Sequence, residues 1–171
     1  MRGFVEHDTT EKKANTSNEW YTPPEIFELL KNPTFDLDPC SPGKDKVPWI
    51  PAVKHYTASD NGLLMPWTGK VWLNPPYGKE TPVWLDKLAL HGNGIALVFA
   101  RTDTKWFHRL VTKADVVCFL AGRVSFVSES GQQGGSAACG SLLLAWGDCA
   151  DILINANVGW TIDNRKLNPL I

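Results

Sequence analysis

The sequence predicts a single α/β domain whose sheet is mostly parallel and becomes antiparallel toward its C-terminal end. Its 171 residues are enough for one hydrophobic core. Apolar runs alternate with helical segments as far as about residue 112, which is typical of parallel strands joined by helices. The later apolar runs follow one another without a helical pattern between them, which favours antiparallel pairing. We expect a flexible arm over 1–17 and one domain over 18–171, without internal repeats.

Periodicity and turn residues place the expected elements along the chain. In order, they are a helix over 23–31, strands over 35–38 and 70–73, a helix over 80–90, a strand over 94–100, a helix over 103–112, and strands over 116–120, 123–127, 141–146 and 152–154. Thr22 and Glu25 have the spacing of a capping box for the first helix, and Pro23 suits its first position. The stretch over 47–56 is ambiguous between a strand and a loop.

Composition and charge exclude several classes of protein. The chain has 43% hydrophobic and 20% charged residues. No apolar run approaches the length of a bilayer span, so we expect a soluble, cytoplasmic protein without membrane contact. The net charge of -1 is not the basic excess of a protein that holds nucleic acid through phosphates alone, so any such contact must use a local basic patch. The four cysteines lack metal-ligand spacing, and we expect reduced, mostly buried thiols and no metal site.

A loop of sequence Asn74-Pro75-Pro76-Tyr77 directly follows the expected strand over 70–73. Proline cannot continue a central strand, so the loop leaves the carboxyl end of the sheet, where α/β proteins place ligands. The side-chain oxygen of Asn74 and the carbonyl of Pro75 are suitable acceptors for the two N–H groups of an exocyclic amine. Tyr77 offers an aromatic face on which a flipped base could stack. We predict that these four residues are catalytic; the alternative is a proline-rich turn without chemistry.

The loop and its surroundings resemble a known family. The run from Leu73 to Gly78 is similar to motif IV of the amino-methyltransferases. Further blocks in the same order resemble the phage DNA N6-adenine methyltransferase family, whose members are small Dam-like enzymes. These blocks are Asn18 to Leu30, Phe35 to Ser41, and Asp60 to Leu63 with the following Trp67. The resemblance covers about residues 18–147.

This resemblance implies a Rossmann-like class I methyltransferase that uses S-adenosylmethionine, without a metal, to methylate the N6 amine of adenine at specific sites in double-stranded DNA. It also implies a bacterial or phage-infected host cytoplasm, and we expect a monomer or a weak dimer. Two alternatives stay open. The same fold and cofactor could serve a glutamine amide of a protein or an RNA base, or the chain could be a catalytically silent, DNA-binding module.

The resemblance also assigns residues to the cofactor. They are Trp20, Tyr21, Thr22 and Pro23 in a segment like motif X, Asp36, Asp38, Pro39 and Cys40 in a segment like motif I, Asp60 at the place of motif III, and Asn74 of the catalytic loop. Each has a simpler interpretation. The first segment could simply be a well-capped helix, the two acids of the second could cap a helix or end a solvated strand, and Asp60 could make an Asx turn. No acid is assigned to the ribose hydroxyls.

A further set of residues is assigned to DNA. It consists of Lys79, Arg101, Lys105, Arg123 and Phe126, with Arg109 as another basic side chain that could contact phosphates. Isolated basic residues are more often solvated, and Phe126 is either a second wall for a flipped base or part of the core. The loop over 128–140 is rich in Gly, Ser and Gln, and we expect it to read the base sequence because no separate recognition domain is expected.

Overall fold

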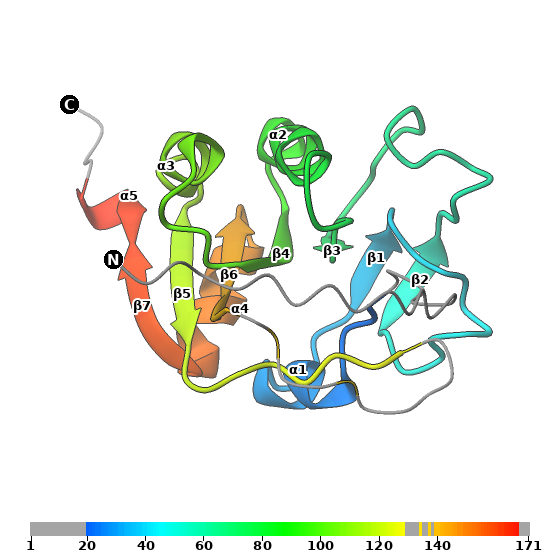
Figure 1. Cartoon of the computed structure of the whole chain (residues 1–171), viewed down its shortest axis with the longest axis horizontal. Helices are drawn as coiled ribbons and strands as arrows, with labels where there is room; N and C mark the ends of the chain where they lie inside the picture. Colours follow the sequence, from blue (N-terminus) through cyan, green and yellow to red (C-terminus); the bar gives the residue numbers. More distant parts are fainter. Residues whose placement is uncertain (1–19, 129–133, 135–136, 138, 168–171) are drawn as a thin grey trace, which may run out of the picture.

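One sheet of seven strands runs through the described part of the chain, with helices on both of its faces (Figure 1). The computed structural model describes residues 20–128, 134, 137 and 139–167, and the expected arm over 1–17 lies outside them. In chain order the elements are α1 (Pro24–Leu29), β1 (Phe35–Asp38), β2 (Ala52–His55), β3 (Val71–Leu73), α2 (Thr81–His91), β4 (Gly94–Phe99), α3 (Lys105–Val111), β5 (Val116–Leu120), β6 (Ser141–Trp146), α4 (Cys149–Ala156), β7 (Gly159–Asp163) and α5 (Asn164–Leu167). The chain is therefore a mixed α/β protein, as the sequence predicts.

The strands lie in the order β2-β1-β3-β4-β6-β5-β7. β1 pairs parallel with β2 and β3, and β3 pairs parallel with β4. β6 lies antiparallel between β4 and β5, and β7 is antiparallel to β5; these three ladders are the longer ones. The expected antiparallel pairing near the C-terminal end is confirmed for β5 and β6, which are two of the four strands expected there. The expectation of a mostly parallel sheet is not confirmed, because β6 pairs antiparallel with both of its neighbours, β4 and β5.

Both faces of the sheet are buried. α1 and α4 cover one face, and α2 and α3 cover the other (Figure 1). On β4, Ile95 and Leu97 belong to the core under α1 and α4, whereas Ala96 and Val98 belong to the core under α2 and α3. Alternate side chains of a strand point to opposite faces, so a strand buried on both faces must be apolar throughout. This accounts for the continuous apolar run over 94–99.

The expected strand over 152–154 is wrong. These residues lie in α4, whose buried side chains Cys149, Ala150 and Leu153 follow a helical spacing. An apolar run of three residues is too short for its period to distinguish a strand from a helix. The edge strand β7 and the short α5 that follows it were not predicted.

The chain between β5 and β6 also differs from expectation. Residues 123–127 form no strand apart from one antiparallel bridge, in which Val127 and Tyr21 exchange backbone hydrogen bonds of 2.9 and 3.0 Å. The bridge fastens the segment before α1 to the segment after β5. The ambiguous stretch over 47–56, by contrast, contains the strand β2.

The start of α1 lacks the expected capping box. Pro23 is the N-cap residue, a second proline follows as the first helical residue, and no side chain caps the helix. Prolines have no N–H to donate, so these positions need no acceptor. The hydroxyl of Thr22 is buried without a hydrogen-bond partner in the structure. The oxygen expected to cap the helix is therefore available for another partner.

None of the four cysteines forms a disulfide; Cys118 and Cys149 are buried, and Cys40 and Cys139 are partly buried. Among the described residues, no group of three or more His, Cys, Asp or Glu side chains is placed to hold a metal ion. None of the helices in that part of the chain has the length and apolar character that crossing a membrane requires.

Candidate active site

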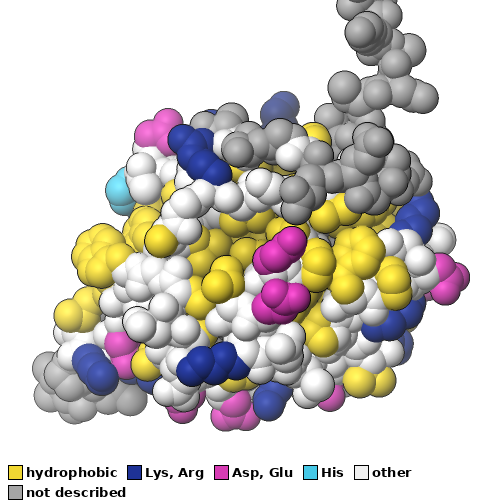
Figure 2. Space-filling model, turned by 90° about the horizontal axis from the view of Figure 1, so that it is seen from below, with side chains coloured by type: hydrophobic (Ala, Val, Ile, Leu, Met, Phe, Trp, Pro, Cys, Tyr) yellow, Lys and Arg dark blue, Asp and Glu magenta, His cyan; other side chains and the backbone are white. Residues whose placement is uncertain are grey.

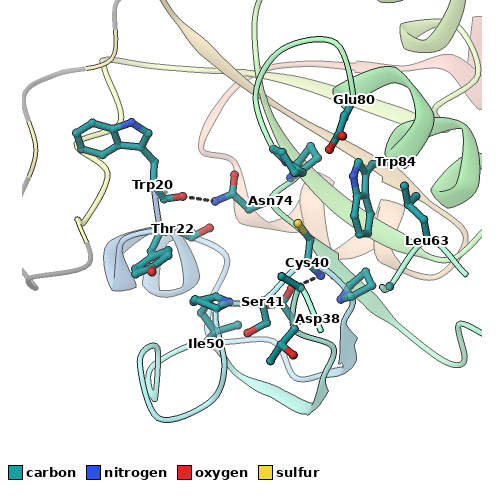
Figure 3. Close-up of a pocket in the computed structure, with 18 of the residues that line it drawn as sticks. Trp20, Thr22, Asp38, Cys40, Ser41, Ile50, Leu63, Asn74, Glu80 and Trp84 are labelled. Atoms are coloured by element: carbon teal, nitrogen blue, oxygen red, sulfur yellow. Dashed lines mark hydrogen bonds between the residues drawn. The ribbon is translucent and has the colours of Figure 1, made fainter. Parts of the chain in front are cut away.

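A cavity of about 680 Å³ opens where β1 and β3 end (Figure 3). β1 leads into residues 39–42 and β3 leads into residues 74–77, and both segments line the cavity. In the sheet, β2 follows on one side of this pair and β4 on the other. From β1 the chain crosses to β2, and from β3 it crosses to β4 in the opposite direction along the sheet. Such a reversal leaves a crevice at the carboxyl ends of the two strands, and α/β proteins bind ligands there. The structure places the loop after β3 at this crevice.

Asn74 is held by a hydrogen bond at each end of its amide. Its Nδ2 donates to the backbone carbonyl of Trp20 at 2.9 Å, which is the dashed line between these residues in Figure 3. Its Oδ1 accepts from the hydroxyl of Tyr77 at 3.0 Å. The two partners fix which end of the amide is oxygen, and that oxygen has a second lone pair with which to accept from a ligand.

Tyr77 lies in an aromatic cluster. Its ring stacks on Phe99 with the centroids 3.9 Å apart and the planes at 14°, and Phe126 meets both rings edge-on. Burial raises the pKa of the Tyr77 hydroxyl, so the group stays protonated and remains a donor at neutral pH. One face of Tyr77 is covered by Phe99. Phe126 is 3% exposed and supports the two rings from the core.

Asp38 ends β1 at the cavity and is 2% exposed. Its Oδ1 accepts from the backbone N–H of Cys40 at 3.2 Å, and its Oδ2 lies 3.7 Å from Nδ1 of His55. Burial raises the pKa of Asp38 to about 7, against the lowering effect of the hydrogen bond from Cys40. Burial also lowers the pKa of His55, whose Nδ1 lies 2.8 Å from Oγ of Ser41. Asp38 therefore changes its charge near neutral pH beside a mainly neutral histidine.

Two residues of the lining carry buried polar atoms without a hydrogen-bond partner in the structure, Oγ1 of Thr22 and Nε1 of Trp84. They lie on opposite sides of the cavity in Figure 3. The backbone of Thr22 is fixed, because its carbonyl accepts from Nε1 of Trp49 at 2.8 Å. A buried polar group without a partner is costly, so both atoms are points at which a polar ligand would be stabilised.

Two acids assigned to the cofactor lie outside the cavity lining. Asp36 is exposed, and its Oδ2 accepts from the backbone N–H of Lys70 at 2.6 Å. Asp60 is also exposed, and its Oδ2 accepts from the backbone N–H and the hydroxyl of Thr57 at 2.7 and 2.8 Å. These two bonds lower the pKa of Asp60. In the described structure Asp36 joins β1 to the segment before β3, and Asp60 stabilises the turn that begins at Thr57.

Most of the other residues assigned to the cofactor line the cavity. They are Trp20, Tyr21, Thr22, Asp38, Pro39, Cys40 and Asn74, joined by Pro75, Pro76 and Tyr77 of the loop, whereas Pro23 lies outside the lining. The lining also contains residues to which the sequence assigned no role, among them Ile50, Glu80 and Trp84. No local pattern groups these three, because only folding brings their segments together.

The segment between β2 and β3 closes one side of the cavity. A Cβ atom on Gly62 would lie 2.0 Å from the backbone oxygen of Pro39, so the close approach of these two segments requires glycine. Lys87 of α2 donates to the carbonyls of Gly62, Leu63 and Met65 at 3.2, 2.7 and 2.6 Å. This wall is therefore held by backbone packing on one side and by a lysine on the other.

A second cavity, of about 380 Å³, shares Tyr77 with the first. Its lining combines aromatic rings, hydroxyl groups and one basic side chain: Tyr77, Gly78, Thr81, Phe99, Arg101, Thr104 and Trp106. Trp106 was not assigned a role from the sequence. It directly follows Lys105, which the sequence did assign to DNA, so its position beside that residue was the available signal.

The basic residues assigned to DNA have different environments. Lys79 and Lys105 are exposed, and Arg101 is exposed at the lining of the second cavity. Arg123 donates from Nη1 to the backbone carbonyl of Ala137 at 2.6 Å. Most of the loop over 128–140, which was expected to read the bases, lies outside the described residues.

Charges are unevenly placed on the surface. Seen from the side of α1, acidic side chains lie both at the middle of the face and along its edge, and basic side chains lie mostly toward the edge (Figure 2). Lys105 begins α3 on the opposite side of the sheet (Figure 1). Arg109 of the same helix is paired with Asp86 of α2 through hydrogen bonds of 2.5 and 2.8 Å.

The fold and the site define an α/β protein with a ligand cavity at the carboxyl ends of its parallel strands, beside an Asn-Pro-Pro-Tyr loop. A family model described as DNA N-6-adenine-methyltransferase (Dam) matches residues 9–160. The chain belongs to this family of DNA adenine methyltransferases, which confirms the resemblance seen in the sequence. No curated protein and no solved structure shows a significant match to the chain.

Proposed function

We propose that the protein transfers a methyl group from S-adenosylmethionine to the N6 amine of adenine at specific sites in double-stranded DNA. The observation that carries this proposal is the position of the Asn-Pro-Pro-Tyr loop, which lines a cavity of cofactor size and shares Tyr77 with a second, aromatic cavity. Membership of the Dam family supports the reaction in general. The reversal of strand order between β1 and β3 supports a Rossmann-like methyltransferase fold.

The first cavity suits S-adenosylmethionine. About 680 Å³ is within the range of small-molecule sites. The unpartnered Oγ1 of Thr22 and Nε1 of Trp84 can bind polar groups of the cofactor, and the carboxyl of Asp38 suits its positive charge. When bound, the cofactor supplies an activated methyl group on a sulfonium. The chain contributes the walls, the hydrogen bonds and the exclusion of water.

The loop after β3 suits an adenine amine. The lone pair of that amine is conjugated with the ring, so it becomes a nucleophile only when its two N–H groups are held as the nitrogen pyramidalises. Oδ1 of Asn74 retains one free lone pair and can accept one of these N–H groups. The carbonyl of Pro75 can accept the other, and the two prolines limit the backbone conformations that it can adopt. Asn74 is anchored by Trp20 and Tyr77, so its oxygen need not reorganise during the reaction.

The second cavity is the proposed place of the flipped base. Phe99 covers one face of Tyr77, so the base would contact the remaining aromatic surface of this cavity, including Trp106. Flipping is required because the N6 amine lies inside the duplex. Arg101 at the lining would contact the phosphates around the extruded nucleotide, together with Lys79, which follows Gly78 of the lining, and Lys105, which precedes Trp106 of the lining.

The test is transfer of labelled methyl groups from S-adenosylmethionine to unmethylated double-stranded DNA, followed by nucleoside analysis. We expect label in N6-methyladenine and a loss of kcat of about 100-fold or more in Asn74→Ala, because an acceptor of the transition state is removed. Asn155→Ala, the same change on the exposed side of α4, is the matched control.

Other results would identify a different function. Label on a protein or RNA acceptor but not on DNA would reassign the substrate to a glutamine amide or an RNA base. Failure to bind S-adenosylmethionine in calorimetry would favour a silent DNA-binding module. An active Asn74→Ala variant would remove the loop from the mechanism.

A further inference from the structure

Thr81 is the first residue of α2, and its side chain is directed to the catalytic loop. Its Oγ1 donates to the carbonyl of Pro76 at 2.7 Å and accepts from the N–H of Gly78 at 3.1 Å. Thr81 is 4% exposed. The N-cap residue of α2 is Glu80, and no side chain caps this helix. The hydroxyl of Thr81 thus closes a loop and does not cap its own helix.

The two backbone groups that Thr81 holds flank Tyr77. One belongs to the residue before Tyr77 and the other to the residue after it, so both peptide units next to Tyr77 are fixed from one side chain. Gly78 has a φ of 123°, a conformation that glycine adopts without strain, and a Cβ there would meet no atom within 4 Å. The turn is therefore limited by backbone conformation and by Thr81, not by lack of space.

Tyr77 passes this constraint to Asn74. Its ring is stacked on Phe99, and its hydroxyl donates to Oδ1 of Asn74 at 3.0 Å. The position of that oxygen therefore depends on where the backbone of Tyr77 lies. A displacement of about 1 Å in such a contact can lower a reaction rate by about 100-fold, although no reacting atom is changed.

We propose that Thr81 is a positioning residue for methyl transfer. Its hydroxyl fastens the peptide units on both sides of Tyr77 and thereby holds the acceptor oxygen of Asn74 in place. This inference rests on the proposed function for its effect on catalysis. The hydrogen bonds that carry it do not depend on the identity of the substrate.

A hydroxyl is required because one atom must donate and accept at the same time. Serine keeps both abilities, whereas valine keeps the shape of threonine and has neither. In Thr81→Val the carbonyl of Pro76 and the N–H of Gly78 lose their side-chain partner. The variants therefore separate the role of the hydroxyl from the role of the side-chain volume.

The kinetic test compares Thr81→Val and Thr81→Ser with the unchanged protein. We expect Thr81→Val to lower kcat by about 10- to 100-fold with the KM for S-adenosylmethionine changed less than about threefold, and Thr81→Ser to retain kcat within about threefold. Thr112→Val, the same change at the exposed end of α3, is the matched control. If Thr81→Val does not fold, Thr81→Ala replaces it with the same expectation. Equal activity of Val and Ser variants would overturn the proposal.

A second measurement does not require activity. Hydrogen exchange of the Gly78 amide, followed by NMR, should be slow in the unchanged protein and in Thr81→Ser, and at least about tenfold faster in Thr81→Val. Equal exchange rates in all three proteins would overturn the proposed role of the Thr81 hydroxyl, even if DNA is methylated. If the wild-type protein methylates no DNA, the proposed function is refuted. The exchange rates would still decide whether the Thr81 hydroxyl holds the loop.

Discussion

At the level of single residues, Asp38 links the candidate site to pH. Desolvation raises the pKa of Asp38 to about 7, and the N–H of Cys40 is its backbone partner. A ligand with positive groups favours the carboxylate over the neutral acid, so its binding competes with a proton on Asp38. The neighbouring His55 has a lowered pKa because of burial and adds little positive charge at neutral pH.

We therefore expect the affinity for S-adenosylmethionine to rise by about tenfold between about pH 6 and about pH 8. Calorimetric titration at a series of pH values measures it. Asp38→Asn, which keeps the size but cannot ionise, should bind weakly with little dependence on pH. An unchanged pH profile in this variant would assign the titration to another group.

The stability of the unliganded protein should depend on pH with the opposite sign. The folded pKa of Asp38 lies above the unfolded value of 3.8, so its contribution to stability is fully present below that value and is lost as pH rises through about 7. The difference in melting temperature between the unchanged protein and Asp38→Asn, followed against pH, reports this contribution.

Among the site residues, the sequence was most informative about the loop over 74–77. The order of a buried strand and a diproline is local, and it requires the loop to leave the sheet at its end. The partners of these residues are not local. The contact of Asn74 with Trp20 spans more than fifty positions, and the stacking of Tyr77 on Phe99 depends on the pairing of two strands.

At the level of elements, Lys87 connects α2 to the cavity wall. Its ammonium accepts no bond and donates to three carbonyls between β2 and β3, while it lies 4.9 Å from the ring centroid of Trp67. Partial burial lowers the pKa of Lys87. One side chain thus binds three backbone carbonyls of this segment.

Lys87→Met should lower the free energy of unfolding by about 1–2 kcal/mol, because a charged donor to several carbonyls is lost while most of the aliphatic stem is kept. The Kd for S-adenosylmethionine should also increase, since Gly62 and Leu63 line the cavity. Urea unfolding and calorimetry measure the two effects. Lys113→Met, at an exposed position just after α3, should change stability by less than about 0.5 kcal/mol.

An equal effect of both lysine substitutions would show that Lys87 acts only as a surface charge.

The helices and strands could be predicted from the sequence only in part. The strand over 94–99 was recognisable because both of its faces are buried, whereas residues 152–154 were too short a run to reveal the helix they belong to. Short elements take their structure from neighbours more than from propensity.

At the level of the whole molecule, β4 lies near the middle of the sheet between two cores. Leu97 is fully buried in the core under α1 and α4. Leu97→Ala should lower the free energy of unfolding by about 2–5 kcal/mol, through lost burial and the cavity that remains. Leu90→Ala is the matched control, since Leu90 is 89% exposed on α2 and should change stability by less than about 0.5 kcal/mol.

Urea unfolding followed by circular dichroism measures both leucine variants. A loss below about 1 kcal/mol in Leu97→Ala would mean that Leu97 is not tightly packed in this core.

The sequence by itself determined what local order can encode: an α/β protein, strands buried on two faces, and an Asn-Pro-Pro-Tyr loop at the end of one of them. These features depend on the period of apolar residues and on the chemistry of proline, which act within a few positions. The tertiary structure decided that β6 lies antiparallel between β4 and β5 and that distant segments line one cavity. It also decided that the Thr81 hydroxyl bonds to the loop. Burial and hydrogen-bond partners are properties of atoms brought together by folding, so no single segment of the chain contains them.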